Sequence, residues 1–191
     1  MCKRPAKPAD KFDRNLKMSN LPNRISSKIQ DPHLQDLVQQ VWSRLKSFDQ
    51  AVLRTLVFEF AVAGDIKDYA FRANGYAAPP SVYSNKGPGE DIGCHVTIPN
   101  AGNQDQDNAC MYVIAHEFAH VVLRHNQLSA MMNSFKEFDI YSDEDFEEYN
   151  TYAEETASLL VWAWGFEDEF NAFFCEVPEA YRPRWFSPAA F

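Results

Sequence analysis

An apolar run at residues 112–125, YVIAHEFAHVVLRH, contains three histidines and a glutamate. Its centre, His116-Glu117-Phe118-Ala119-His120, is an HExxH motif. On a helix, residues four apart lie one turn apart on the same face, so two imidazoles can share one metal ion. Glu117 would then reach a metal-bound water without being a ligand. The motif predicts a metal site with Glu117 as the catalytic acid and base; two histidines with structural hydrogen bonds are the alternative.

The surrounding helix is expected over about residues 108–126. Its apolar residues gather on one face, and His116 and His120 fall on the opposite face. His125 falls within the apolar arc, so we interpret it as a hydrogen-bonded core histidine rather than a ligand.

A catalytic zinc site has three protein ligands and leaves a fourth position to water. The acidic helix expected near residues 144–165 offers several carboxylates. On a helical wheel Glu154 lies beside the buried stripe, whereas Glu155 points toward solvent. Glu154 is therefore the predicted third ligand of a single Zn²⁺ ion. The same donors also bind Mn, Co or Ni.

The residues "AHEFAHVVLRH", followed some thirty positions later by "AEETASLLVWAWGF", resemble the ImmA/IrrE type of small cytosolic gluzincin metallopeptidase. Those proteins carry HE-L-x-H-xx-LGH and then E-x-E-A-D, with the first glutamate as ligand. The resemblance covers about residues 106–166 and implies that Glu154 is that glutamate and Ala157 that alanine. It also implies a zincin-like domain that cleaves a protein partner inside the cell, often a repressor.

Two departures from that pattern matter for the site. The family's aspartate, which holds a zinc histidine, is here Ser158, which can hydrogen-bond an imidazole but brings no negative charge. Arg124 replaces a small residue before His125. It is either a residue that steers an anionic group or an ordinary solvent-facing arginine near a helix end.

Several features around the motif leave alternatives open. The second donor to the oxyanion could be Tyr149, Tyr152, His95 or Arg124. The segment CHVTIP (94–99) is predicted to be an edge strand, which either pairs with an extended substrate or is purely structural. Residues 127–145 form either a lid or substrate wall, or a packed connecting helix.

The rest of the chain predicts one domain over residues 31–191. Asp31-Pro32 is a good helix start, and the following apolar stripe indicates an amphipathic helix. A second helix is expected over 49–64, with its later half open to a strand interpretation, and residues 77–91 form a loop. The expected class is α+β: a predominantly helical zincin-like domain with a small edge-exposed β-sheet.

The net charge of −9 is unevenly distributed. Residues 1–30 hold eight Lys and Arg against two Asp, which leaves −15 for the remainder. This basic head is predicted to be a flexible tail, with a docking arm as the alternative. The acidic body argues against nucleic acid as a partner.

No export signal or membrane-spanning segment is evident, and the cysteines form no CxxC pair. We therefore expect a cytoplasmic protein with reduced thiols.

Three functions fit these observations. The first is a zinc-dependent endopeptidase acting on a protein or peptide. The second is a catalytically inactive zincin-like binding module with a structural metal site. The third is a nucleic-acid adaptor that uses the basic head. The sequence does not specify the substrate, any trigger or the oligomeric state.

Overall fold

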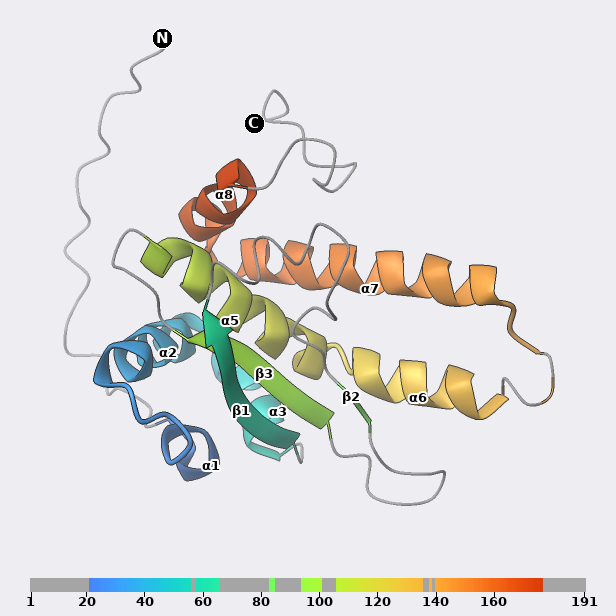
Figure 1. The fold of residues 1–191 in the computed structure, drawn as a ribbon, viewed down its shortest axis with the longest axis horizontal. Helices are drawn as coiled ribbons and strands as arrows, with labels where there is room; N and C mark the ends of the chain where they lie inside the picture. Colours follow the sequence, from blue (N-terminus) through green and yellow to red (C-terminus); the bar gives the residue numbers. More distant parts are fainter. Residues whose placement is uncertain are drawn as a thin grey trace, which may run out of the picture.

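The computed structural model describes residues 21–55, 58–65, 83–84, 94–100, 106–135, 138 and 140–176. Helices dominate this part of the chain, and Figure 1 shows them arranged around one central helix. They are α1 (Asn23–Ser26), α2 (Pro32–Arg44), α3 (Ser47–Thr55), α5 (Asp107–Val122), α6 (His125–Phe135), α7 (Asp143–Ala163) and α8 (Glu167–Glu176).

The predicted α+β class with an edge-exposed sheet is wrong, because the described part of the chain is mainly helical. Among the described residues, the strands are β1 (Phe58–Asp65), β2 (Tyr83–Ser84) and β3 (Cys94–Asn100), paired in the order β1-β3-β2. The segment predicted as an edge strand is thus the middle one. It runs parallel to β1 and antiparallel to β2.

Proline explains an irregularity in this pairing. Val62 lies opposite Ile98 and Asp65 opposite Asn100, so the register shifts at Pro99. Proline has no backbone N–H to donate, and a local irregularity lets the ladder continue past it. The later half of the expected helix 49–64 is β1, as its β-branched and aromatic residues allowed.

The N-terminal helices begin where the sequence indicates. The Asp31 carboxylate accepts a hydrogen bond from the His33 backbone N–H at 2.9 Å, and Pro32 occupies the first helical position. The apolar stripe of α2 is buried in the core. Residues 21–30 do not match the flexible tail predicted for residues 1–30, because they include α1 and the buried side chains of Leu21 and Ile25. Residues 1–20 lie outside the described part.

The central helix α5 is enclosed on all sides. Every residue from 109 to 121 is buried, and α5 contacts α2, α3, α7, α8 and β3 (Figure 1). Both the apolar face and the histidine face are therefore covered, which is typical of a helix at the centre of a domain. Cys110 on this helix is a free thiol whose pKa is raised to about 12, chiefly by burial.

The long helix α7 begins with a capping box. The Ser142 hydroxyl accepts from the Asp145 backbone N–H, and the Asp145 carboxylate accepts from the Ser142 N–H. After Ala163 the chain turns at Gly165, whose φ of +86° suits glycine. None of the described helices combines the length and apolar character needed to cross a bilayer.

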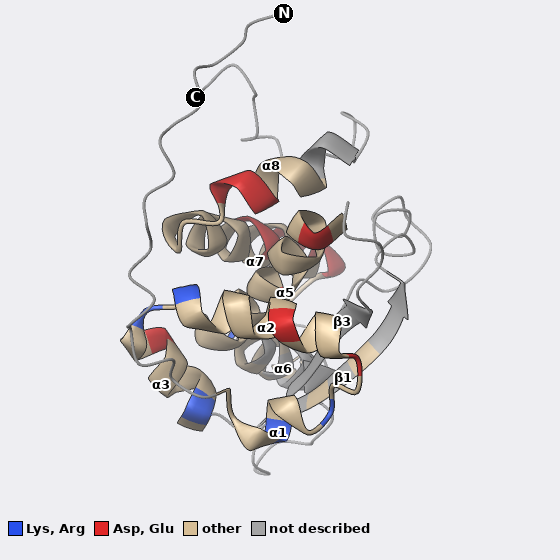
Figure 2. Ribbon diagram, turned by 90° about the vertical axis from the view of Figure 1, so that its left-hand side faces the viewer, with Lys and Arg blue, Asp and Glu red and all other residues tan. Residues whose placement is uncertain are grey.

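A charged contact links α2, near the start of the described chain, to α8, near its end. Helix α8 opens with three acidic residues and has no basic one, whereas basic residues lie on α1, α2 and α3 (Figure 2). The Arg44 guanidinium at the end of α2 donates to both carboxylate oxygens of Glu169 and to the Gly165 carbonyl. It also lies 3.7 Å from the centre of the Phe166 ring. Arg44 thereby fixes α8 to α2.

Replacing Arg44→Met should lower the free energy of unfolding by about 2–3 kcal/mol, because the Glu169 carboxylate is only 9% exposed and would lose its partner. Adding Glu169→Met should recover much of the loss. Denaturant unfolding measures both, with the exposed neighbour change Asp168→Asn as the control, expected within about 0.5 kcal/mol of wild type. Equal stability of Arg44→Met and wild type would contradict a structural role for this contact.

Candidate metal centre

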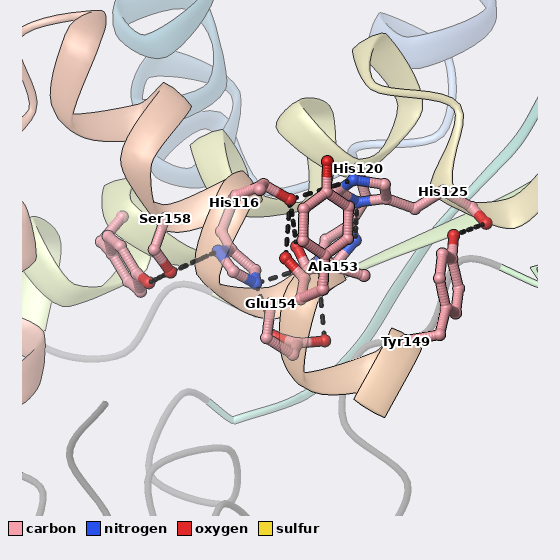
Figure 3. A network of polar contacts seen from close by, with 10 residues as sticks. His116, His120, His125, Tyr149, Ala153, Glu154 and Ser158 are labelled. Carbon is pink, nitrogen blue, oxygen red and sulfur yellow. Dashed lines mark hydrogen bonds and ion pairs between the residues drawn. The ribbon is translucent and has the colours of Figure 1, made fainter. Parts of the chain in front are cut away.

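Helix α5 brings the two histidines of the HExxH motif to one point. The Nε2 atoms of His116 and His120 lie 3.0 Å apart, with the ring planes at 80°. Both side chains point toward α7, which supplies Glu154 (Figure 3). The Glu154 carboxylate lies 2.9 Å from His116 Nε2 through one oxygen and 3.5 Å from His120 Nε2 through the other.

This geometry suits a tetrahedral divalent ion. Zn–N and Zn–O bonds of about 2.0–2.2 Å at tetrahedral angles place ligand atoms roughly 3.3 Å apart. The three donor separations bracket that value, and one ligand atom from each residue lies within 4.8 Å of the others. Two imidazoles and a carboxylate also match the donor types of catalytic zinc sites. The residues present therefore fit zinc.

The site is buried on the side of α5 and open on the side of α7. The His116 and His120 side chains are 11% and 9% exposed, whereas that of Glu154 is 58% exposed. Although desolvation acts to raise the pKa of Glu154, hydrogen bonds and charge from the two imidazoles lower it well below its ordinary value. Burial lowers the pKa of His120, which favours the neutral ring that a metal requires.

Glu117 is almost fully buried, with 2% of its surface exposed. None of the described residues gives its Oε2 atom a hydrogen-bond partner. Burial, and then the negative charge of Glu154, raise the pKa of Glu117 well above its ordinary value. A buried carboxyl oxygen without a partner is costly, so its retention next to His116 is more typical of a reactive group than of a structural one.

Hydroxyl groups contact the far side of the His116 ring. The Nδ1 atom of His116 lies 3.4 Å from both the Ser158 and the Tyr112 oxygens, which are 2.9 Å from each other. Ser158 therefore lies where the sequence analysis expected a partner for a zinc histidine. Tyr112 was missed, although it precedes His116 by one helical turn and so shares its face. Burial is the main cause that raises the pKa of Tyr112, so its hydroxyl keeps its proton.

His125 is a buried, hydrogen-bonded histidine, as the sequence analysis interpreted it. The wheel placed it on the opposite face from the histidine pair, and this part of the prediction is wrong because His125 contacts His120. Helix α5 ends at Val122, and Arg124 has a φ of +59°, so the chain turns before α6 begins. A wheel that assumes one helix to residue 126 cannot place a residue beyond this turn. His125 is buried, and its Nδ1 atom lies 3.0 Å from the Nδ1 atom of His120. Its pKa is lowered to about 4, first by burial and then by the charge of His120.

The expected oxyanion donors take different positions. Tyr149 donates its hydroxyl proton to the His125 carbonyl at 2.6 Å, and its pKa is raised to about 12, mainly by burial. Tyr152 is 56% exposed, and its ring centre lies 6.4 Å from that of His125. Arg124 is exposed at the turn. The backbone of His95 lies in β3, but its side chain falls outside the described part.

A model of peptidase family M48 matches residues 47–156. The match includes the whole HExxH helix and ends just beyond Glu154, and it covers more than half of the 191 residues. The narrower resemblance to the ImmA/IrrE type is not confirmed by this match. No match was found among curated proteins or solved structures. Family M48 comprises metallopeptidases that typically use zinc. The chain belongs to peptidase family M48.

Proposed function

We propose that this protein is a zinc-dependent endopeptidase of the gluzincin type, with His116, His120 and Glu154 as the metal ligands. The observation that carries the proposal is the convergence of these three side chains from two helices, with donor separations that suit a tetrahedral ion. Membership of peptidase family M48 supports the same chemistry.

Glu117 is the proposed acid and base. Zinc, when bound, would polarise a water molecule and lower its pKa toward neutrality. Glu117 would accept a proton as that water attacks a peptide carbonyl, and would then deliver the proton to the departing amine. The Nε2 atoms of His116 and His120 must be unprotonated to serve as metal ligands. The groups that contact the Nδ1 atoms help to keep the ring proton on Nδ1. The exposed side of Glu154 leaves room for a substrate to approach.

The resemblance of "AHEFAHVVLRH" and "AEETASLLVWAWGF" to ImmA/IrrE proteins favours a protein partner and regulatory cleavage inside the cell. A non-catalytic zincin module remains the second candidate. It is favoured by Ser158, because a hydroxyl 3.4 Å from the His116 ring raises ligand basicity less than a carboxylate would. Zinc binding is common to both candidates, and only peptide hydrolysis separates them.

Removing the third ligand should weaken metal binding. Glu154→Ala is expected to lower zinc affinity by roughly 100-fold or more, since loss of even a group that only hydrogen-bonds a metal ligand costs about 10–100-fold. Competition with a chromophoric chelator measures the dissociation constant. Glu155→Ala, at the adjacent position on α7, is the matched control and should bind as wild type does. Equal affinity of Glu154→Ala and wild type would rule out Glu154 as a ligand.

Glu117→Gln should keep one zinc per chain and lose peptide hydrolysis, with kcat lower by about 10²–10⁴, because the amide cannot accept the proton. Cleavage of unfolded casein and of a quenched peptide library measures activity, and metal analysis measures zinc content. Glu155→Gln serves as the active control. Zinc-loaded wild type that cleaves none of these substrates would favour the non-catalytic module instead.

A further inference from the structure

The turn between α5 and α6 holds His125 against the back of His120. Arg124 adopts a left-handed conformation that bulky residues seldom take, and this brings the next residue toward α7. The Tyr149 hydroxyl then donates to the His125 carbonyl at 2.6 Å. Figure 3 shows this contact beside the metal ligands. Main chain and side chain of His125 are thus both held, and the residue is only 6% exposed.

Hydrogen-bond chemistry fixes the direction of this contact. The Nε2 atom of His120 faces His116 and Glu154, so a neutral ring that binds metal there carries its proton on Nδ1. That N–H must donate to the Nδ1 lone pair of His125, 3.0 Å away. His125 then carries its own proton on Nε2, which lies 3.2 Å from the Thr156 hydroxyl oxygen.

The chain of donors ends on the backbone of α7. The Thr156 hydroxyl donates to the Tyr152 carbonyl at 2.8 Å, which leaves its oxygen free to accept from His125. Within this series His125 and Thr156 each accept one hydrogen bond and donate one. One tautomer of His120 and one of His125 satisfy every contact, which is the condition for a polar network that orients a ring.

We propose that His125 is a positioning residue that holds the His120 imidazole in the Nδ1–H tautomer and in the orientation that presents Nε2 to the metal. The inference rests on the proposed metal site and deepens it. In many zinc proteins a carboxylate or a backbone carbonyl accepts from a ligating histidine. Here a neutral imidazole, itself anchored to Thr156 on α7, takes that role.

The two ligand histidines are consequently held unequally. Among the described residues, the Nδ1 atom of His116 has only the two hydroxyl oxygens as partners, each at 3.4 Å. The Nδ1 atom of His120 instead has the Nδ1 atom of His125 at 3.0 Å, and the other nitrogen of that His125 ring contacts Thr156. A shorter contact with a single acceptor restricts ring rotation more than two long contacts do. Loss of the acceptor behind His120 should therefore reduce metal affinity markedly.

Zinc affinity of full-length variants tests the proposal. His125→Leu, similar in bulk but without an acceptor, should bind zinc 10–100-fold more weakly. His125→Asn, whose amide oxygen can lie near the former Nδ1 position, should recover most of that affinity. Thr156→Val removes the anchor of His125 with little change of volume and should give a smaller loss. His33→Leu, a change at a histidine on α2, is the matched control and should bind as wild type does.

The pattern of results separates this inference from the proposed function. Wild type that binds no zinc would overturn both. Wild type that binds zinc, with His125→Leu equal to it, would overturn the positioning role alone. The same holds if His125→Leu and His125→Asn weaken zinc binding equally, because a purely structural role would not distinguish a hydrogen-bond acceptor from an apolar group. Should His125→Leu fail to fold, Thr156→Val decides: unchanged affinity would refute the anchored network.

Nitrogen NMR of the zinc-loaded protein gives a second, direct readout. The chain has five histidines, so ¹⁵N-labelled imidazoles can be assigned by single substitutions. We expect His120 protonated at Nδ1 and His125 protonated at Nε2. In Thr156→Val the His125 Nε2–H signal should shift, while that of His33 stays unchanged. A His125 ring protonated at Nδ1 would contradict the proposal, because it could not accept from His120.

Discussion

The close approach of α5 and α7 is the contact on which the site depends. The two imidazoles belong to one helix and the carboxylate to another, 38 residues away along the chain from His116. On α7 the residues buried next to Glu154 include Ala153 and Ala157, which are small. Small side chains at a helix crossing allow the two backbones to approach, so a glutamate can reach the opposing helix without extending into the core. A bulky residue at Ala157 would move Glu154 away from the rings.

Burying His116, Glu117 and His120 on the central helix α5 has an energetic cost. Buried polar atoms destabilise a fold unless they find partners. At this site Tyr112 and Ser158 lie against His116, and His125 lies against His120, whereas Oε2 of Glu117 has no partner among the described residues. The buried nitrogen atoms of the two proposed histidine ligands thus have hydrogen-bond partners, whereas one carboxyl oxygen of the proposed base has none among the described residues. This difference matches the roles, because a ligand needs a fixed orientation and a base needs a lone pair free for a proton.

The sequence predicted the chemistry of the site better than its surroundings. The HExxH spacing and the wheel position of Glu154 depend only on helical periodicity, and within α5 and α7 that periodicity is regular. His125 could not be placed, because the helix breaks at Arg124 without the glycine or proline that normally marks such a turn. The prediction that residues 94–99 form an edge strand was wrong for another reason. The position of a strand in a sheet depends on its pairing with other strands, here β1 and β2, which local sequence does not encode.

The break at Arg124 also explains how the outer half of α7 is connected to the site. Along α7 the residues before Ala153 are exposed or half-buried, so this half projects beyond the core. Tyr149 from this half and Thr156 from the buried half both bond to His125, the first through its carbonyl and the second through its ring. A continuous α5 would have carried His125 past α7 and removed both contacts. The strained turn therefore joins the start of α6, the exposed part of α7 and the back of His120 in one hydrogen-bonded unit. Movement of the outer half of α7 would consequently act on the His120 ring as well as on Glu154.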